Sequence, residues 1–459
     1  MKYWEVPKMP KATRLRQLIN VFSPFPLTNE NFDEFYVDTT AVRGIEMEKL
    51  KYTLMYGNHQ FAKILFSGHI GSGKTTELYN LAKSVSDKYE VITISVLKDL
   101  DIYNMSHVDL IFEIMSSILL HFENRSGDIA ELRADAFSQL YNIWHSEHFI
   151  TTIFTDENEA SLESSAGASG SVTLSAGTDL ISRIKFLIKV AMKGQSILKT
   201  STETKDELKT KLEPRMGDLI AAINSVTQEI NSNLGGKELL IIIEDLDKAD
   251  QESVNEIFTK HFTQLSDINV KMIFNIPISL EYSLSFKKIK DNANANFVLS
   301  AVNIANIDGT KNTENIQFFK KFVYKRAEEK FFDDEALDFM IEKSGGILRD
   351  LFAILVDASI NADLRHPDNE IILMDDAEAA CMKLRNVYVK SIEKKEQYDT
   401  LLSIYKDPSN IFEDDILLKL LQANLVIECG EYKEYQVHPL VIDYMRYRRD
   451  IKERGDVTE

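Results

Sequence analysis

One octapeptide constrains the fold of this chain more than any other segment, because it fits the pattern G-x-x-x-x-G-K-[ST] at every fixed position. It comprises Gly68, His69, Ile70, Gly71, Ser72, Gly73, Lys74 and Thr75. An apolar run at 63–67 precedes it and a helical pattern over 75–87 follows it, which is the setting of a phosphate-binding loop. We therefore expect its backbone N–H groups and the helix N-terminus to bind phosphate oxygens. A glycine-rich turn with an exposed lysine is the alternative, which both flanks disfavour.

Side-chain chemistry gives roles to this loop and to a second segment. Lys74 is expected to reach the β- and γ-phosphates, the Thr75 hydroxyl to ligate Mg²⁺, and Thr76 to border the same site. A later apolar run, 238–243, ends in Glu244 and Asp245. Acids at the carboxyl tip of a buried parallel strand lie where open α/β sheets bind ligands. One acid would hold the Mg²⁺ shell while its neighbour polarises a water, although acids in a solvated turn have the same local pattern.

Five short apolar runs have the length and β-branched content of buried strands: 63–67, 90–96, 238–243, 270–276 and 297–302. Helical spacing separates them, which predicts an α/β fold with a parallel sheet. About 140 residues separate the second run from the third, so we predict a helical insertion over about 105–236. Its expected parts are a helix over 105–122, a Ser/Gly-rich loop over 160–178, and a helix over 208–230 kinked at Pro214. That loop is either flexible or a segment that orders on a partner.

Helical patterns dominate after about residue 310. They cover 315–329, 334–343, 349–362 and 374–392, and two more helices are followed by a hairpin of 425–428 and 435–437. Two helices and a hairpin suggest a winged-helix-like module. The predicted domains are an N-terminal arm (1–34), a P-loop α/β core (35–310), a helical lid (311–394) and the winged-helix-like domain (395–459).

The charge balance limits the partners that the chain can have. Its 53 Lys and Arg against 72 Asp and Glu give a net charge of −19, which disfavours a protein that mainly coats nucleic acid. Cys381 and Cys429 are too few and too far apart for a disulfide framework or a zinc site. With no apolar stretch long enough to span a membrane, we expect a cytoplasmic protein without membrane association. The densest basic clusters lie at the two ends: Lys2, Lys8, Lys11, Arg14 and Arg16, and Arg446, Arg448, Arg449, Lys452 and Arg454.

Two further polar residues are site candidates. Asn275 ends the fourth run and would orient a water through its amide, or would cap the strand before Pro277. Arg349, shortly after Gly345 and Gly346, would fold back onto the γ-phosphate, or would pair with acids on a solvated face. The guanine-reading N-K-x-D of GTPases is missing after the fourth run, and the LSGGQ of transport ATPases is missing before the acidic strand. ATP, with water as acceptor, is the remaining choice.

Four segments together resemble the AAA+ and STAND class of P-loop ATPases, including its KAP-like and origin-recognition-like branches: GHIGSGKTT, LLIIIEDLDK, KMIFNIP and GGILRDL. The resemblance covers about 35–105 and 237–450. It implies the strand order 5-1-4-3-2, ATP between core and lid, and a cationic finger from a neighbouring subunit. Candidates for that finger are Lys287, Lys288, Lys290 and Arg326.

The resemblance also implies residue roles. Val42 and Arg43, before Gly44, are similar to a segment that lines the adenine pocket, with the Arg and Gly in reversed order. The first acid of the class belongs to the magnesium shell and the second activates water, which would make Glu244 the metal-side acid and Asp245 the water-side acid. A Glu in the first place departs from the usual Asp and leaves the catalytic acid open.

Three functions fit these features. The first is an ATP-driven switch that forms homo-oligomers and controls a separately encoded effector or adaptor, with a role in bacterial anti-phage defence implied by the resemblance. The second is a DNA-binding ATPase of the initiator, loader or transposition type, which would use the winged-helix tail and its basic C-terminal helix. The third is a nucleotide-binding scaffold that does not hydrolyse ATP.

Overall fold

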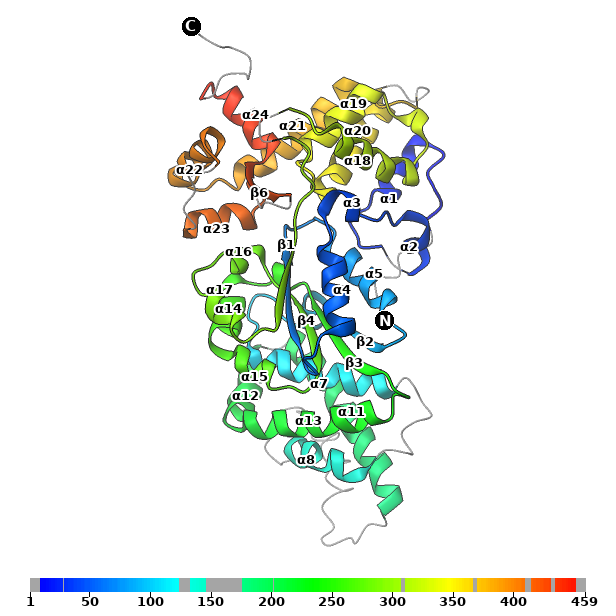
Figure 1. The fold of residues 1–459 in the computed structure, drawn as a ribbon, viewed down its shortest axis with the longest axis vertical. Helices are drawn as coiled ribbons and strands as arrows, with labels where there is room; N and C mark the ends of the chain where they lie inside the picture. The colour runs from blue at the N-terminus through cyan, green and yellow to red at the C-terminus, as the bar shows by residue number, and fades with distance from the viewer. Residues whose placement is uncertain are drawn as a thin grey trace.

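The computed structural model describes residues 9–27, 29–123, 133–145, 176–200, 202–306, 310–365, 370–408, 414–430 and 434–450. Across these ranges, a five-stranded parallel sheet forms the core (Figure 1). Its order is β2-β3-β4-β1-β5, which confirms the predicted order 5-1-4-3-2. The strands are β1 (Lys63–Gly68), β2 (Tyr89–Ser95), β3 (Glu238–Glu244), β4 (Lys271–Asn275) and β5 (Ala295–Leu299).

These strands are apolar in sequence because their side chains are buried on both faces of the sheet. β1 and β4 are buried at every position. On one face, Ile64 and Phe66 pack with α4 (Glu46–Tyr56) and α5 (Lys74–Ser84). On the other face, Leu65 belongs to a larger core that includes α7 (His107–Glu123). The parallel register brings the carboxyl ends of β1 to β4 to one edge, where the phosphate loop and the acids lie.

The insertion is helical, as predicted, and lies at the lower end of the molecule in Figure 1. Pro214 falls in a 3₁₀ turn, Glu213–Arg215, so the predicted kinked helix consists of two helices around that turn. Of the predicted Ser/Gly-rich loop, 160–175 lie outside the described residues, and its last residues already belong to α11. The elements are α7, α8 (Ala134–Trp144), α11 (Ala176–Thr200), α12 (Thr202–Leu212) and α13 (Met216–Ser232).

The lid and the C-terminal module lie at the opposite end (Figure 1). The lid contains α18 (Thr313–Arg326), α19 (Asp334–Lys343), α20 (Leu348–Arg365) and α21 (Met374–Lys390). The C-terminal module contains α22 (Lys395–Lys406), α23 (Asp415–Gln422), the antiparallel pair β6 (Val426–Cys429) and β7 (Glu434–Val437), and α24 (Pro439–Tyr447). The predicted pair of helices and hairpin is therefore present.

The N-terminal arm is part of the lid. The Ala12 N–H donates to the Arg326 carbonyl at 2.8 Å, and Leu15, Leu18 and Phe22 are buried in the lid's hydrophobic core. From there the chain crosses to the α/β core through α2 (Asn29–Phe35) and α3 (Thr40–Arg43). Among the residues that the structure describes, no helix combines the length and the apolar character that a membrane span requires.

Candidate nucleotide-binding site

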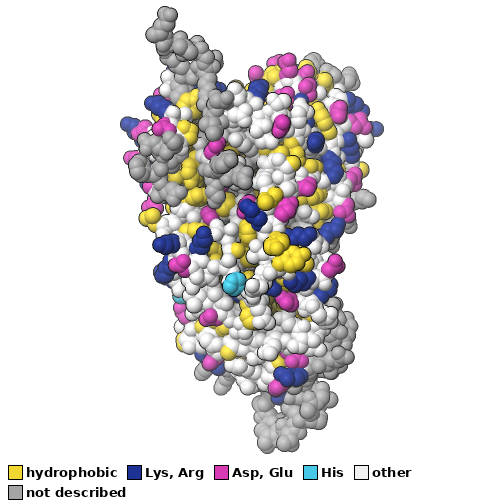
Figure 2. All heavy atoms as spheres, viewed as in Figure 1, with side chains coloured by type: hydrophobic (Ala, Val, Ile, Leu, Met, Phe, Trp, Pro, Cys, Tyr) yellow, Lys and Arg dark blue, Asp and Glu magenta, His cyan; other side chains and the backbone are white. Residues whose placement is uncertain are grey.

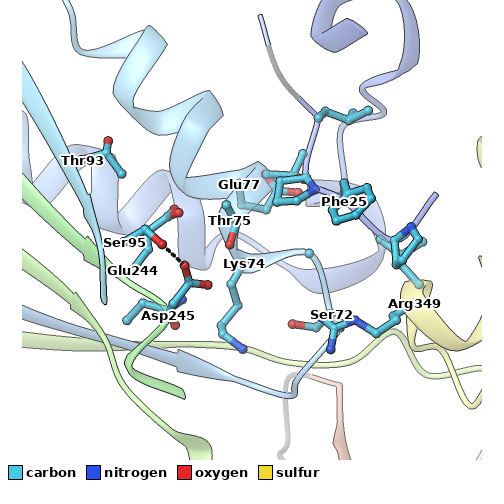
Figure 3. A pocket seen from close by; sticks show the side chains of 18 of the residues that line it. Phe25, Ser72, Lys74, Thr75, Glu77, Thr93, Ser95, Glu244, Asp245 and Arg349 are labelled. Atoms are coloured by element: carbon cyan, nitrogen blue, oxygen red, sulfur yellow. Dashed lines mark hydrogen bonds between the residues drawn. The ribbon is translucent and has the colours of Figure 1, made fainter. Parts of the chain in front are cut away.

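A cavity of about 700 Å³ opens at the carboxyl edge of the sheet. The phosphate loop, the acidic end of β3, the tip of β4, the start of α20 and the N-terminal arm all line it (Figure 3). Such a concave site at the carboxyl ends of parallel strands is where α/β proteins bind ligands. The octapeptide contributes its last five residues, Gly71 to Thr75, and the next residue, Thr76, also lines the cavity.

Glycines give the loop its path. Gly71 and Gly73 have φ of +87° and +100°, a region that side chains disfavour. A Cβ on Gly71 would also lie 2.6 Å from the Cβ of Arg349. Gly73 immediately precedes α5, so the loop delivers the chain to a helix N-terminus that faces the cavity.

Lys74 is tied to a third acid. Its Nζ lies 2.8 Å from Asp247 Oδ2 and donates to the carbonyls of Gly68 and His69 at 2.8 and 2.9 Å. Burial lowers the pKa of Lys74, and the charge of Asp247 opposes that shift. Sequence reasoning gave Asp247 no role, although its place two residues after the acidic pair was a usable signal.

Glu244 has the properties of an incomplete cation ligand. Its side chain is buried, and Oε1 has no hydrogen-bond partner among the described residues. Burial, followed by the charge of Asp245, raises its pKa well above the ordinary value. A cation beside it would favour the charged form. In the described part of the chain no three His, Cys, Asp or Glu side chains cluster as a metal site. Glu244 and the Thr75 hydroxyl, together with phosphates and water, are the groups that would hold Mg²⁺.

Asp245 adopts a left-handed backbone conformation, with φ of 68°. Ser95, at the end of β2, donates its hydroxyl to Asp245 Oδ2 (Figure 3). Lys248 pairs with the other carboxylate oxygen. Asp245 is therefore held from two sides at the cavity wall, whereas Glu244 is not.

Asn275 and Arg349 both line the cavity, where sequence reasoning placed them. Asn275 is buried at the tip of β4, between β1 and β3, and its Oδ1 lacks a partner within the described residues. The backbone N–H of Arg349 donates to the Gly71 carbonyl at 3.2 Å. Its side chain borders the cavity beside Ser72 (Figure 3).

The residues before the phosphate loop differ from their expected role. Arg43 is buried, and its Nη2 donates to the Ser72 carbonyl at 2.7 Å, so it braces the loop from behind. Its Nε and Nη1 have no partner in the described chain. Val42 packs with the lid's hydrophobic core and does not line the cavity. The predicted adenine segment is thus a support for the loop, with Arg43 alone reaching the cavity.

Three loop residues assigned to the ligand do not line the cavity: Gly68, His69 and Ile70. His69 is completely buried and contacts the C-terminal module. The prediction assigned all eight residues of the octapeptide to the ligand, and five of them, Gly71 to Thr75, line the cavity. The motif predicts the backbone conformation of the loop, but it does not predict the contact of His69 with the C-terminal module.

Sequence reasoning missed the contribution of the arm. Pro24, Phe25 and Pro26 line the cavity opposite the phosphate loop, together with Phe352 of α20. The sequence of the arm contains Pro7, Pro10, Pro24 and Pro26, which are typical of an extended segment but do not indicate the surface on which it lies. Arg326 also lines this cavity, with its guanidinium 5.2 Å from the ring centre of Phe352. Arg326 was a candidate for the finger that reaches a neighbouring subunit. Because its side chain is only 3% exposed, it belongs to the cavity of its own chain instead.

Within the described residues, acidic side chains pair with arginines of the C-terminal basic cluster. Arg446 lies 3.4 Å from Asp443, and Arg448 lies 2.9 Å from Asp450 and over the ring of Tyr398. Positive and negative side chains alternate over the face shown in Figure 2. Of the predicted clusters, Lys2, Lys8, Lys452 and Arg454 lie outside the described residues.

No protein-family model and no curated protein matches this sequence. The structure is similar to Cdc6p from Pyrobaculum aerophilum, with 10% identity and a TM-score of 0.39, over 94% of this chain and 96% of that one. It is also similar to the ORC1 protein of Aeropyrum pernix, solved with DNA, with 11% identity and a TM-score of 0.38, over 95% and 98%. A third likeness is to the RuvB branch migration motor of Thermotoga maritima, with 11% identity and a TM-score of 0.35, over 89% and 95%.

The strand order and the loop geometry decide the fold independently of these distant likenesses. The fold is a parallel α/β P-loop fold with the AAA+-like strand order 5-1-4-3-2. What this P-loop protein binds is inferred below from its own residues.

Proposed function

We propose that this chain binds Mg·ATP, hydrolyses it, and uses the cycle as an oligomerising switch that controls a separately encoded partner protein. One observation carries the proposal: Lys74, paired with Asp247, lines a cavity of about 700 Å³ together with Glu244 and Asn275, each of which has a side-chain oxygen without a partner among the described residues. These groups are a cation for phosphates, an acid for a metal shell and an amide for a water, and each of them can gain partners when a nucleotide enters.

The chain's own residues supply most of the chemistry. Lys74 would exchange Asp247 for the β- and γ-phosphates, and the amides of Gly71 to Thr75 would bind phosphate oxygens. Thr75 and Glu244 would hold Mg²⁺, which when bound neutralises phosphate charge. Asp245 would polarise the attacking water and Asn275 would orient it. Arg349 would contact the γ-phosphate from the lid, because α20 begins at the cavity wall.

The base would lie between the arm and the lid. Phe25, Phe352 and Arg326 offer aromatic and cationic surfaces on that side of the cavity. The arm belongs to the lid's hydrophobic core but also faces the phosphate loop. A bound nucleotide would therefore join core and lid, which gives ATP a way to change the shape of the protein.

A neighbouring subunit would complete the site. The remaining finger candidates, Lys287, Lys288 and Lys290, are exposed on α17 (Phe286–Lys290), where basic side chains gather at the left of Figure 2. An exposed cation can reach a second copy, whereas Arg326 cannot. We accordingly assign the finger role to this helix in the homo-oligomer.

The DNA-binding alternative has less support. α23 packs against α16 (Ile278–Glu281) of the core, and its Gln422 donates to the Asp247 carbonyl at 3.0 Å. α23 is the helix that would enter a groove of DNA in a winged-helix module; its N-cap is Asp414 and its first residue is Asp415. A helix with two acids at its N-terminus that is docked on the core is poorly placed to bind phosphates.

Mass photometry with and without a non-hydrolysable ATP analogue tests the switch. We expect wild-type protein to assemble with the analogue and Mg²⁺, and Lys74→Ala to remain at its nucleotide-free size. A triple Lys287→Ala, Lys288→Ala and Lys290→Ala variant should keep ATP binding but lose turnover. If the wild type has the same mass in all conditions, the switch is refuted.

The proposed role in bacterial anti-phage defence is tested separately. Cells carrying the gene and its neighbours would be challenged with phages, with Lys74→Ala as the matched inactive variant. Protection lost in that variant supports the role, and equal plaque counts with and without the wild-type gene would refute it.

A further inference from the structure

The C-terminal module contacts the phosphate loop from the side opposite the cavity. His69, the second residue of the octapeptide, is fully buried against the turn between α23 and β6. Its Nδ1 lies 3.1 Å from Asn424 Oδ1, and the backbone N–H of Glu428 donates to its Nε2 at 2.7 Å. The two partners come from the beginning and the end of one short segment of the module.

These contacts define the state of the imidazole. Because Nε2 accepts a hydrogen bond from a backbone N–H, the ring proton must be on Nδ1, which then donates to Asn424 Oδ1. The amide nitrogen of Asn424 donates to the Ile70 carbonyl at 2.8 Å. One amide group therefore holds a side chain and a backbone carbonyl of consecutive loop residues.

The same turn also holds the acidic loop after β3. Gln422, two residues before Asn424, donates to the Asp247 carbonyl at 3.0 Å and accepts from the Ser279 hydroxyl at 3.1 Å. Asp247 is the residue whose carboxylate pairs with Lys74. Residues 422–428 thus bind both segments that carry the groups facing the cavity.

None of these contacts covers the cavity. The loop residues that line it begin at Gly71, and neither Asn424 nor Glu428 is among its lining residues. The geometry of Asn424 is also specialised, since its φ of 54° is a left-handed conformation that Asn tolerates better than most residues. A contact that orients the loop without occupying the ligand site stabilises the form that binds ligand.

We propose that Asn424, Gln422 and His69 are positioning residues for nucleotide binding, so that docking of the C-terminal module and binding of ATP favour each other. This inference rests on the proposed ATP binding. Coupling is reciprocal, because whatever the docked module adds to ATP affinity, ATP adds to docking. Couplings of this kind change affinity by about 5- to 150-fold.

Asn424→Gly tests the proposal with little backbone cost, because glycine adopts the left-handed conformation and only the amide group is lost. Asp399→Ala is the matched control. Asp399 belongs to α22 of the same module, and its side chain is exposed, so its removal leaves the contacts of the module with the core unchanged. Binding of a fluorescent ATP analogue, measured at equilibrium, and proteolysis of the module would be recorded for each protein.

We expect Asn424→Gly to raise the Kd for the analogue at least fivefold, and Asp399→Ala to leave it within twofold. We also expect ATP to slow proteolysis of the module in the wild type and not in Asn424→Gly. A second variant, Gln422→Ala, should shift both readouts in the same direction. If Asn424→Gly and Gln422→Ala bind the analogue like the wild type, the inference is overturned. If the wild type itself binds no ATP, the proposed function is refuted, and the inference with it.

Discussion

Lys74 Nζ and Asp247 Oδ2 lie 2.8 Å apart at the base of the cavity, both buried to within 5% exposure. A buried lysine needs its counter-charge, and bound phosphates would supply a stronger one. The pair therefore marks the position that the phosphates would take. It also makes the stability of the nucleotide-free protein depend on an acid that ATP would displace.

Asp247→Asn should separate the role of Asp247 in the stability of the nucleotide-free protein from its competition with phosphates for Lys74. Removing one partner of a buried pair costs about 3 kcal/mol, so the melting temperature of the nucleotide-free variant should fall by several degrees. ATP restores a counter-charge to Lys74, so the rise in melting temperature on adding ATP should be larger than in the wild type. Thermal unfolding with and without ATP measures both. A smaller ATP effect in the variant would contradict this account of the pair.

Substitutions of Glu244 and Asp245, the two acids at the end of β3, should affect ATP turnover in different ways. Glu244 has a raised pKa and an unsatisfied oxygen, whereas Asp245 is held by Ser95 and Lys248. We expect Glu244→Gln to raise the Mg²⁺ concentration needed for half-maximal turnover. Asp245→Asn should lower kcat by about 10²- to 10⁴-fold with little change in that concentration. Turnover measured across a Mg²⁺ titration distinguishes them, and the reverse pattern would exchange their roles.

The arm should contribute to base binding but not to phosphate binding. Phe25→Ala removes an aromatic ring from the cavity wall, and we expect ATP affinity to fall by about three- to tenfold, corresponding to about 0.5–1.5 kcal/mol. Tripolyphosphate, which has no base, should compete equally well in both proteins. Competition binding measures both ligands. An equal loss for tripolyphosphate would place Phe25 against the phosphates.

Lowering the pH should reduce the free energy of unfolding through the protonation of His69. Burial lowers the pKa of His69 to about 4, below the ordinary value of 6.5, and the nearby charges of Lys74 and His438 add to that shift. The unfolded chain then binds this proton at higher pH than the folded one, so stability is complete above pH 6.5 and falls as pH drops toward 4. The loss approaches about 3 kcal/mol.

Denaturant unfolding between pH 7 and 4 measures how steeply the free energy of unfolding falls with pH. We expect a shallower fall in His69→Asn than in the wild type. The difference separates the contribution of His69 from that of His107, whose pKa is also lowered by burial to about 4. Equal slopes in the two proteins would contradict the contribution of His69.

Much of the fold was predictable because local chemistry determined it. Each of the five strands lies within a few residues of an apolar run, and Pro214 marks the break between α12 and α13. The fifth run extended past β5 because Ala301 bridges to Cys429 of the C-terminal module. The strand order came from resemblance, since periodicity does not encode which strands are neighbours.

The site was predicted less completely, for a physical reason. Lys74, Glu244, Asp245, Asn275 and Arg349 could be named from the sequence because each belongs to a motif or ends a strand, and all five line the cavity. Two features were missed: the contact between His69 and Asn424, and the position of Arg326 in the cavity wall. Both bring together residues that lie far apart in the chain. Such contacts depend on how domains dock, which the local pattern around each residue does not contain.

Phosphate release from ATP, measured with Mg²⁺ for the wild type and for Lys74→Ala, tests the central claim most directly. The account predicts turnover by the wild type that requires Mg²⁺, and none above background for Lys74→Ala, which should still be folded by circular dichroism. No turnover by the wild type across oligomer-forming concentrations, or equal turnover by the two proteins, would contradict it.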